Sequence, residues 1–188
     1  MSPPKPGVTP LESVNPWKPG TKPPSSKPPK GARKANELMP QSYTCLHYHL
    51  VFSTKDRRPT ITPAIRQRLW EYLGGIVRGA GGIPIQIGGT DDHVHLLVTL
   101  RQQPALADFM RELKAGSSGW VHDTFPGASE FWWQTGYGAF TVSHSALDIV
   151  KWYIVNQEEH HKKQSFQDEF RALLERHGIA FDDKYLWE

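Results

Sequence analysis

The residues best suited to chemistry are two histidines, His93 and His95, which lie two positions apart among β-favouring residues. Alternate residues of a β-strand project from the same face, so both imidazoles share one face while Val94 fills the other. Two ring nitrogens held on a rigid strand make half of a metal site. A histidine pair is weak evidence by itself, because two histidines on a wet sheet face are the more common case.

A second histidine pair, His47 and His49, has the same spacing in an earlier segment. One of the two pairs is then a coincidence, or both pairs face a shared site on adjacent strands. Asp92 precedes the later pair and is a candidate to orient a ligand histidine, although a turn residue needs no such role. The spacing leaves these alternatives open.

A tyrosine and a glutamine, Tyr153 and Gln157, form a second pair four positions apart. On a helix this spacing places a phenol and an amide on one face, where both can point at the same place. Considered alone, Tyr153 is more often an aromatic anchor at the edge of a core, and Gln157 is more often solvated. The pair therefore gains meaning only in combination with the histidines.

Eight elements are expected to position these residues. Runs rich in β-branched and aromatic residues predict strands over residues 43–54, 83–87, 93–100 and 131–143. Apolar residues at helical spacing predict helices over residues 63–78, 104–125, 145–161 and 166–175. Thr62 and Ser145 are the expected N-caps of the first and third helices.

The predicted order of elements, β-α-β-β-α-β followed by helix, is typical of an α+β, ferredoxin-like fold. This split βαβ arrangement has a four-stranded antiparallel sheet with two helices on one face, and here a further helix carrying Tyr153 follows. The other face of the sheet is then expected to be free. Many ferredoxin-like domains bind single-stranded nucleic acid on that face, but the fold alone does not establish a function.

Composition divides the 188-residue chain into two parts. Residues 1–38 contain ten of the sixteen prolines and seven Lys or Arg against two Glu, which gives a charge of +5. This segment is expected to be a disordered tail, partly in polyproline II conformation. Residues 39–188 are expected to be the folding unit, with a charge of +3 − 5 = −2. Nucleic acid would therefore have to bind this unit at a local basic patch.

The sequence also excludes several classes of protein. Cys45 is the only cysteine, so an intrachain disulfide and any cysteine-cluster zinc or iron–sulfur site are excluded. No stretch approaches the roughly 18 consecutive apolar residues that a membrane span needs, and no apolar run typical of a signal peptide is seen. A cytoplasmic protein without membrane partners is expected.

In combination, a strand with His-Val-His and a later helix with Tyr-Ile-Val-Asn-Gln resemble the single-tyrosine HUH transposases. These are the TnpA-like enzymes of insertion-sequence groups two hundred and six hundred and five. The resemblance extends in family order to residues 48–55, 92–98, 133–143, 153–161 and 178–187. It covers about residues 40–187, whereas the tail resembles nothing recognised.

This resemblance implies roles for four residues. His93, His95 and Gln157 would bind a divalent cation, Mg²⁺ or Mn²⁺, and Tyr153 would be the nucleophile. Because a free tyrosine has a pKa near 10, a cation that polarises the scissile phosphate is consistent with such chemistry. The resemblance further implies cleavage and rejoining of single-stranded DNA at hairpin-marked ends through a 5′-phosphotyrosine, without a nucleotide cofactor. It also implies a homodimer in which the tyrosine helices are exchanged.

Cationic and aromatic residues beside these segments are candidates for DNA contacts, either with phosphates or by stacking on bases. Some of the aromatic residues are equally compatible with a place in the core. The candidates are Lys55, Arg57, Arg58, Arg111, Lys114, Trp132, Trp133 and Tyr137.

Three other functions compete with the transposase hypothesis. A domesticated relative would cut or bind repeated hairpins without mobility. A ferredoxin-like nucleic-acid-binding module would have no catalysis, so Tyr153→Phe would leave its activity intact. A metal phosphodiesterase that uses water would cleave DNA without forming a protein–DNA adduct.

Overall fold

The computed structural model describes residues 43–184 and 186–187. The predicted tail, residues 1–38, and the predicted domain start at residue 39 lie outside this part of the chain. Within the described residues, no helix combines the length and the apolar character that crossing a membrane requires.

Four strands form one antiparallel sheet in the order β2-β3-β1-β4. Because β1 pairs with β3 and β4, it lies inside the sheet, and β2 and β4 form the edges. This topology confirms the predicted α+β, ferredoxin-like fold. The strands are β1 (His47–Ser53), β2 (Ile83–Gly89), β3 (His93–Thr99) and β4 (Gly138–Val142).

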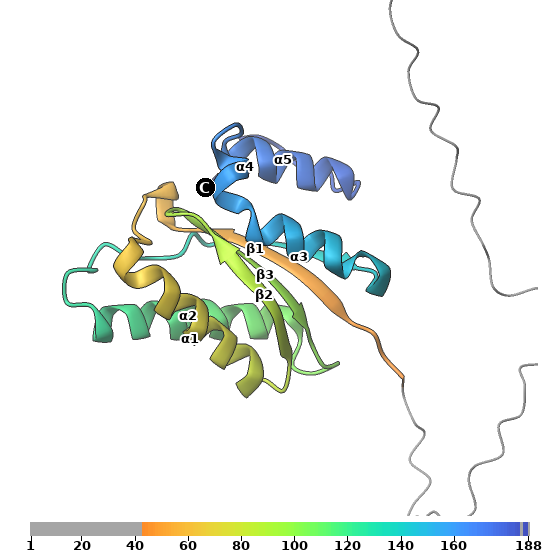
Figure 1. The fold of residues 1–188 in the computed structure, drawn as a ribbon, viewed down its shortest axis with the longest axis horizontal. Helices are drawn as coiled ribbons and strands as arrows, with labels where there is room; N and C mark the ends of the chain where they lie inside the picture. Colours follow the sequence, from red (N-terminus) through yellow and green to blue (C-terminus); the bar gives the residue numbers. More distant parts are fainter. Residues whose placement is uncertain (1–42, 185, 188) are drawn as a thin grey trace, which may run out of the picture. The chain divides into compact units, whose positions relative to one another are not determined.

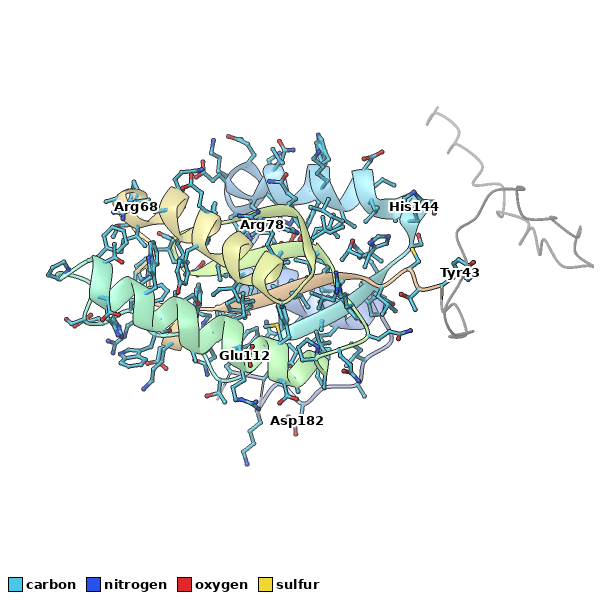
Figure 2. All side chains as sticks on the ribbon, turned by 90° about the horizontal axis from the view of Figure 1, so that it is seen from below. Tyr43, Arg68, Arg78, Glu112, His144 and Asp182 are labelled. Atoms are coloured by element: carbon cyan, nitrogen blue, oxygen red, sulfur yellow. The ribbon has the colours of Figure 1, made fainter. Side chains whose placement is uncertain are left out.

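Two long helices, α1 (Pro63–Gly79) and α2 (Leu106–Thr124), cover one face of the sheet (Figure 1). Figure 2 shows them side by side, with Arg68 and Arg78 on α1 and Glu112 on α2. Proline suits the first turn of α1 because its missing N–H would have no partner there. The apolar core lies between these helices and the sheet, where it contains Leu50, Phe52, Val94, Leu96, Val98, Leu69, Leu73, Phe109 and Leu113.

Three shorter helices lie on the opposite side of the sheet (Figure 1). They are α3 (Leu147–Val155), α4 (Gln157–His161) and α5 (Phe166–Arg176). Val51 and Phe140 of the sheet pack there against Phe166 and Phe170 of α5. The expectation that this face would be free is therefore wrong, because the C-terminal helices bury it.

The strand predicted over residues 131–143 is shorter than expected. Only β4, residues 138–142, pairs along β1, while the preceding residues form a loop with a single bridge between Thr54 and Trp133. In this loop the Lys114 ammonium donates to the carbonyl oxygens of Thr135 and Gly136, at 2.9 and 2.8 Å. A side chain thus satisfies backbone groups that a continuous strand would pair with another strand.

The helix predicted over residues 145–161 is divided into α3 and α4 at Asn156. The Asn156 side-chain amide donates to the Trp152 carbonyl at 2.7 Å, and its backbone has φ −97° and ψ 19°. The Asn156 backbone N–H also donates to this carbonyl, at 3.2 Å, so backbone and side chain of Asn156 share the acceptor at the end of α3. Ser145 lies within a short 3-10 turn, η2 (His144–Ala146), and makes no capping hydrogen bond, so its predicted role as N-cap is wrong.

Candidate active site and metal centre

His93 and His95 lie on the face of β3 that α3, α4 and α5 cover, and both side chains are 0% exposed. The register places His95 opposite Val51 and His93 opposite Ser53, so the two imidazoles stand side by side on this face. Val94, Leu96 and Val98 fill the other face, as the alternation in the sequence predicts. The strand therefore presents two buried imidazoles to the C-terminal helices.

A carboxylate fixes the orientation of His93. Its Nδ1 lies 2.6 Å from Asp92 Oδ1 and 2.9 Å from Thr90 Oγ1, and the Thr90 hydroxyl donates to the same carboxylate at 2.8 Å. A carboxylate accepts only, so the proton of a neutral His93 sits on Nδ1 and leaves Nε2 with a lone pair. The interaction with His93 keeps the pKa of Asp92 below its usual range, although burial of Asp92 acts in the opposite direction. Asp92 thus occupies the orienting position considered from the sequence.

Only one histidine of the earlier pair, His49, joins the cluster that His93 and His95 form. His49 Nε2 lies 2.9 Å from His95 Nδ1, and both rings are buried. His47 instead lies 2.8 Å from Thr99 Oγ1 through Nδ1. Burial lowers the pKa of His49 to about 3, and the charge of His95 acts in the same direction. Burial likewise lowers the pKa of His95 to about 4, so both imidazoles are neutral near pH 7, which is the form that binds metals.

Tyr153 and Gln157 meet the histidines within a single chain. Gln157 is 1% exposed, and its Oε1 lies 3.2 Å from His93 Nε2. The Tyr153 ring stands edge-on to His95 and His49, with centroid distances of 5.9 and 6.1 Å. The structure thus brings together all four residues that the resemblance singles out.

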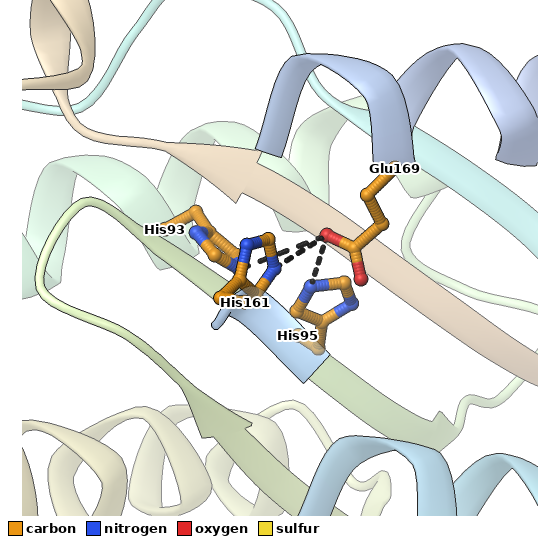
Figure 3. Close-up of side chains that lie close together, drawn as sticks. All are labelled: His93, His95, His161 and Glu169. Carbon is orange, nitrogen blue, oxygen red and sulfur yellow. Dashed lines mark hydrogen bonds and ion pairs between the residues drawn. The ribbon is translucent and has the colours of Figure 1, made fainter. Parts of the chain in front are cut away.

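A fifth group, Glu169 of α5, lies at the centre of this cluster and was missed from the sequence (Figure 3). Its Oε1 accepts hydrogen bonds from the Tyr153 hydroxyl and, at 2.9 Å, from Gln157 Nε2. Its Oε2 lies 3.1 Å from His161 Nε2 and 3.3 Å from His95 Nε2. The sequence contained a signal for it, because Glu169 stands on the same helical stripe as buried Phe166 and Phe170, where a solvated carboxylate is unexpected.

The charge of Glu169 dominates the electrostatics of the cluster. Burial tends to raise the pKa of Glu169, but the hydrogen bond from His161 and the nearby imidazoles of His95 and His93 lower it far below the usual range. Burial and the Glu169 charge together raise the pKa of Tyr153 above its ordinary value. Burial opposes protonation of His161, yet the hydrogen bond to Glu169 and its charge leave the His161 pKa raised. The cluster therefore combines an ionised carboxylate with a protonated phenol.

The atoms of this cluster fit a divalent cation. The ligand atoms of His93, His95, His161 and Glu169 lie within 4.8 Å of one another. His95 Nε2 is buried and has no hydrogen-bond partner, because its 3.3 Å approach to Glu169 Oε2 lacks hydrogen-bond geometry. A buried nitrogen without a partner is costly unless it binds something else, and imidazole with carboxylate is a common donor set for transition metals.

Two pockets surround the candidate DNA contacts. One, of about 660 Å³, opens beside His161. Its lining mixes three cationic side chains with four acidic ones, namely Arg57, Arg66 and Lys162 with Asp56, Asp91, Asp92 and Glu158. A second, of about 550 Å³, lies between α2 and the loop before β4. It contains five of the residues predicted from the sequence to contact DNA, namely Arg111, Lys114, Trp132, Trp133 and Tyr137.

These five residues differ in what they offer to a ligand. Trp132 and Tyr137 are 51% and 38% exposed, whereas Trp133 is 8% exposed and its Nε1 donates to Ser117. Trp133 therefore belongs to the core, and the prediction that it stacks on bases is not favoured by its burial. Lys114 binds the loop carbonyls, and burial lowers its pKa to about 8.

The remaining three cationic candidates follow β1. Lys55 and Arg57 lie in the short turn η1 (Lys55–Arg57), and Arg58 comes directly after it. The Arg57 guanidinium lies over the Trp187 ring, 5.2 Å from its centroid, and Arg58 lies 3.7 Å from Glu130. Arg58 and Glu130 are both exposed, so their ion pair does not hold Arg58 firmly. Arg57 and Trp187 are instead both half-buried.

Comparison with known proteins identifies relatives of this chain. A curated relative, the ISDra2 transposase TnpA of Deinococcus radiodurans, is 29% identical over 119 residues, which are 61% of this chain and 85% of the relative. A crystal structure of a Deinococcus radiodurans protein assigned to the transposases has a TM-score of 0.51 at 26% identity, covering 65% of this chain and 98% of the other. A tyrosine transposase associated with REP sequences, solved with a REP hairpin, has a TM-score of 0.50 at 16% identity, covering 68% and 74%.

The family profile described as "Transposase IS200 like" matches residues 42–157. The match runs from β1 to Gln157 and so includes His93, His95 and Tyr153. It leaves α5 and Glu169 outside. With this match, the chain belongs to the IS200-like tyrosine transposases, enzymes that cut and transfer DNA strands.

Proposed function

We propose that this protein is a metal-dependent transposase that cleaves and rejoins single-stranded DNA through a 5′-phosphotyrosine at Tyr153. The observation that carries this proposal is the position of the Tyr153 phenol. It lies within one chain beside the buried imidazoles of His49 and His95 and is hydrogen-bonded to Glu169. A tyrosine that only anchored its helix would not need this cluster of metal-binding side chains.

In the proposed reaction, Tyr153 Oη attacks the scissile phosphorus and the bond from phosphorus to the 3′ oxygen breaks. The phenol loses its proton, and the departing strand gains one at its 3′-hydroxyl. His93, His95 and Gln157 would hold the cation, and when bound, Mg²⁺ or Mn²⁺ supplies Lewis-acid polarisation of the phosphate. Asp92 fixes the His93 ring, and Glu169 Oε1 fixes the direction of the phenol.

The covalent intermediate explains how strands are rejoined without ATP. A phosphotyrosine retains the energy of the phosphodiester bond, so another 3′-hydroxyl can attack it and release Tyr153. This property distinguishes a strand transferase from a phosphodiesterase that uses water, in which cleavage is final. No nucleotide cofactor is needed for this cycle.

Hairpin-forming single-stranded DNA is the proposed substrate. A neighbour with the same fold was solved with a REP hairpin, which supports a hairpin ligand here. The pocket beside the metal centre is lined by both cationic and acidic side chains. Arg66 and Lys162 are paired there with Glu158 and Glu159, so Arg57 is the candidate in this pocket for a contact with the phosphate backbone. The exposed Trp132 and Tyr137, in the pocket beside α2, offer rings on which bases can stack.

A homodimer is also part of the proposal. Ile149, Trp152 and Val155 of α3 are 72%, 69% and 61% exposed, and their spacing places them along one side of the helix. Such an apolar stripe on a surface helix is typical of an interface, and a second copy of the chain is the partner that the family resemblance implies. We expect Trp152→Glu to convert a dimer into a monomer in light scattering. A wild-type mass that corresponds to one chain would contradict the dimer.

Exchange of tyrosine helices between the two copies can be tested separately. Because one chain already places Tyr153 beside its own His95, we infer that cleavage does not require exchange. A mixture of Tyr153→Phe and His93→Ala chains is therefore expected to stay inactive. Recovery of cleavage by the mixture would instead establish the exchanged arrangement.

The deciding experiment incubates the protein with single-stranded hairpin oligonucleotides and Mn²⁺ and separates the products on a denaturing gel. We expect a covalent protein–DNA adduct that disappears with chelator, in Tyr153→Phe, and in His93→Ala or His95→Ala. Tyr72→Phe is the matched control and should keep the adduct, since this tyrosine lies on α1, on the other face of the sheet, where its ring stacks on Trp120.

Two results would contradict the proposal. An adduct that persists in Tyr153→Phe would assign the nucleophile to another residue. Cleavage without any adduct would identify a phosphodiesterase that uses water. The expected cytoplasmic location stays a prediction that localisation of the tagged protein can test.

A further inference from the structure

The carboxylate of Glu169 has two oxygens with different surroundings. Oε1 accepts from two donors, the Tyr153 hydroxyl and Gln157 Nε2. Oε2 faces the imidazoles, at 3.3 Å from His95 Nε2, 3.8 Å from His93 Nε2 and 3.1 Å from His161 Nε2. The side chain is 2% exposed, so water does not compensate its charge. One oxygen therefore holds the nucleophile while the other points towards the metal-binding nitrogens.

Lone pairs converge where Oε2 points when His95 carries its proton on Nδ1, which lies 2.9 Å from His49 Nε2. His93 directs its Nδ1 at the Asp92 carboxylate, so a neutral His93 presents an unprotonated Nε2 to Gln157 Oε1, 3.2 Å away. His95 Nε2 is buried without a hydrogen-bond partner, although it lies 3.3 Å from Oε2. Acceptors that face one another in a buried site repel unless a proton or a cation lies between them. This arrangement fits four ligand atoms around a positive ion, two of them imidazole nitrogens.

The remaining contacts of Glu169 do not account for its burial. His161, 13% exposed at its side chain, lies at the rim of the cluster and supplies one hydrogen bond to Oε2. His160 Nε2 lies farther away, 4.0 Å from Oε1, and its side chain is 34% exposed. Burying an ionised carboxylate is costly, and partners at the edge of the cluster offset only part of that cost. A divalent cation at the centre would balance both the carboxylate charge and the lone pairs of the imidazoles.

We propose that Glu169 Oε2 is a further ligand of the divalent cation, so that α5 completes the metal centre begun by β3 and α4. The inference rests on the proposed function, because it concerns the same metal. It adds a residue outside the family match, which ends at residue 157. It also gives one carboxylate two tasks, since Oε1 holds the Tyr153 hydroxyl and Oε2 holds the metal.

Binding of Mn²⁺ to the purified full-length chain tests this ligand without measuring activity. Calorimetry should give one site in the wild type and none in His93→Ala. For Glu169→Gln, which has the same shape but no charge, we expect the dissociation constant to rise at least about tenfold. Glu175→Gln is the matched control, because Glu175 lies on the same helix and is exposed.

A second variant keeps the test valid if Glu169→Gln does not fold. Glu169→Asp retains the charge but withdraws the carboxylate by one methylene, so Mn²⁺ should again bind more weakly than to the wild type. Circular dichroism of each variant establishes that it is folded. In crystals soaked with Mn²⁺, we expect the ion located by its anomalous peak to be bonded directly to Oε2.

The possible failures can be told apart. If His93→Ala abolishes Mn²⁺ binding but Glu169→Gln binds like the wild type, Glu169 is not a ligand and the proposed function stands. An anomalous peak on the imidazoles with water between it and Oε2 has the same meaning. If neither His93→Ala nor His95→Ala alters binding, the metal centre of the proposed function itself is wrong.

Discussion

The two faces of the sheet are made by the same strands but hold opposite kinds of side chain. Towards α1 and α2, β3 presents Val94, Leu96 and Val98, all 0% exposed. Towards α3, α4 and α5, it presents His93 and His95, also 0% exposed. Both faces are equally buried, so burial alone does not distinguish a core from a site.

What distinguishes the faces is how their buried groups are satisfied. Apolar side chains gain free energy from leaving water and need no partner. Imidazoles and a carboxylate lose solvation on burial, so each must find a hydrogen bond, an ion pair or a metal. We therefore expect the α1–α2 face to stabilise the fold. On the α3–α5 face, burial of the polar groups of Tyr153, His95 and Glu169 is expected to lower the free energy of unfolding.

The largest expected effect on stability comes from Leu96→Ala on the apolar face. Leu96 is 0% exposed within the α1–α2 core, and a leucine-to-alanine change in such a place costs about 2–5 kcal/mol of unfolding free energy. Urea unfolding measures this loss. Mn²⁺ affinity of the folded fraction should stay unchanged, and a parallel loss of affinity would show that the two faces are not separate in function.

A smaller loss of stability is expected from a change where α3, the helix that carries Tyr153, packs against β2. A Cβ at Gly88 would lie 2.7 Å from the Ile154 carbonyl oxygen, so Gly88→Ala must displace α3 from β2. Overpacking of this kind costs about 1–3 kcal/mol, and adduct formation should fall because Tyr153 moves with its helix. Gly75→Ala is the control, since nothing lies within 4 Å of its Cβ and a helical alanine gains about 0.5–1 kcal/mol. Normal adduct yield in Gly88→Ala would show that α3 tolerates the shift.

Asp92→Ala should lower the affinity for the metal, although Asp92 is not one of the proposed ligands. The Asp92 carboxylate lies 2.6 Å from His93 Nδ1 and fixes the direction of the ring. Loss of such a partner typically lowers metal affinity about 10–100-fold. Calorimetry with Mn²⁺ measures the change, and Asp91→Ala, an exposed neighbour, is the control. Equal affinity of the two variants would mean that packing alone orients His93.

The smallest expected effect is the pH dependence of stability that the polar face imposes. The folded pKa values of His49 and His95, about 3 and 4, lie below the ordinary value of 6.5. Between about pH 6.5 and pH 4 the unfolded chain therefore binds more protons, so their contribution is present above pH 6.5 and is lost on acidification. His161, whose pKa is raised, acts in the opposite direction.

We expect a net loss on the order of 1 kcal/mol between pH 7 and pH 5.5, measured by urea unfolding of the metal-free protein. His49→Gln should reduce this loss, while exposed His144→Gln should not. A wild-type stability that is constant or rises on acidification would show that His161 outweighs the buried pair.

The sequence by itself determined the order of strands and helices in the sheet domain and one half of the site. Alternation in β3 placed His93 and His95 on one face, and helical spacing with Pro63 located α1. Both inferences depend on local periodicity, which is set by backbone geometry within a few residues. The order of elements was then sufficient to identify the ferredoxin-like sheet.

Only the tertiary structure decided how the second face is closed. Gln157, directly after the break at Asn156, is buried beside His93, and the packing of α5 brings Glu169 to His95, 74 residues earlier in the chain. The register of β1 against β3 places His49 beside His95 and His47 beside Thr99. Such contacts depend on how whole elements pack against one another, and no local repeat in the sequence records a distance between groups so far apart along the chain.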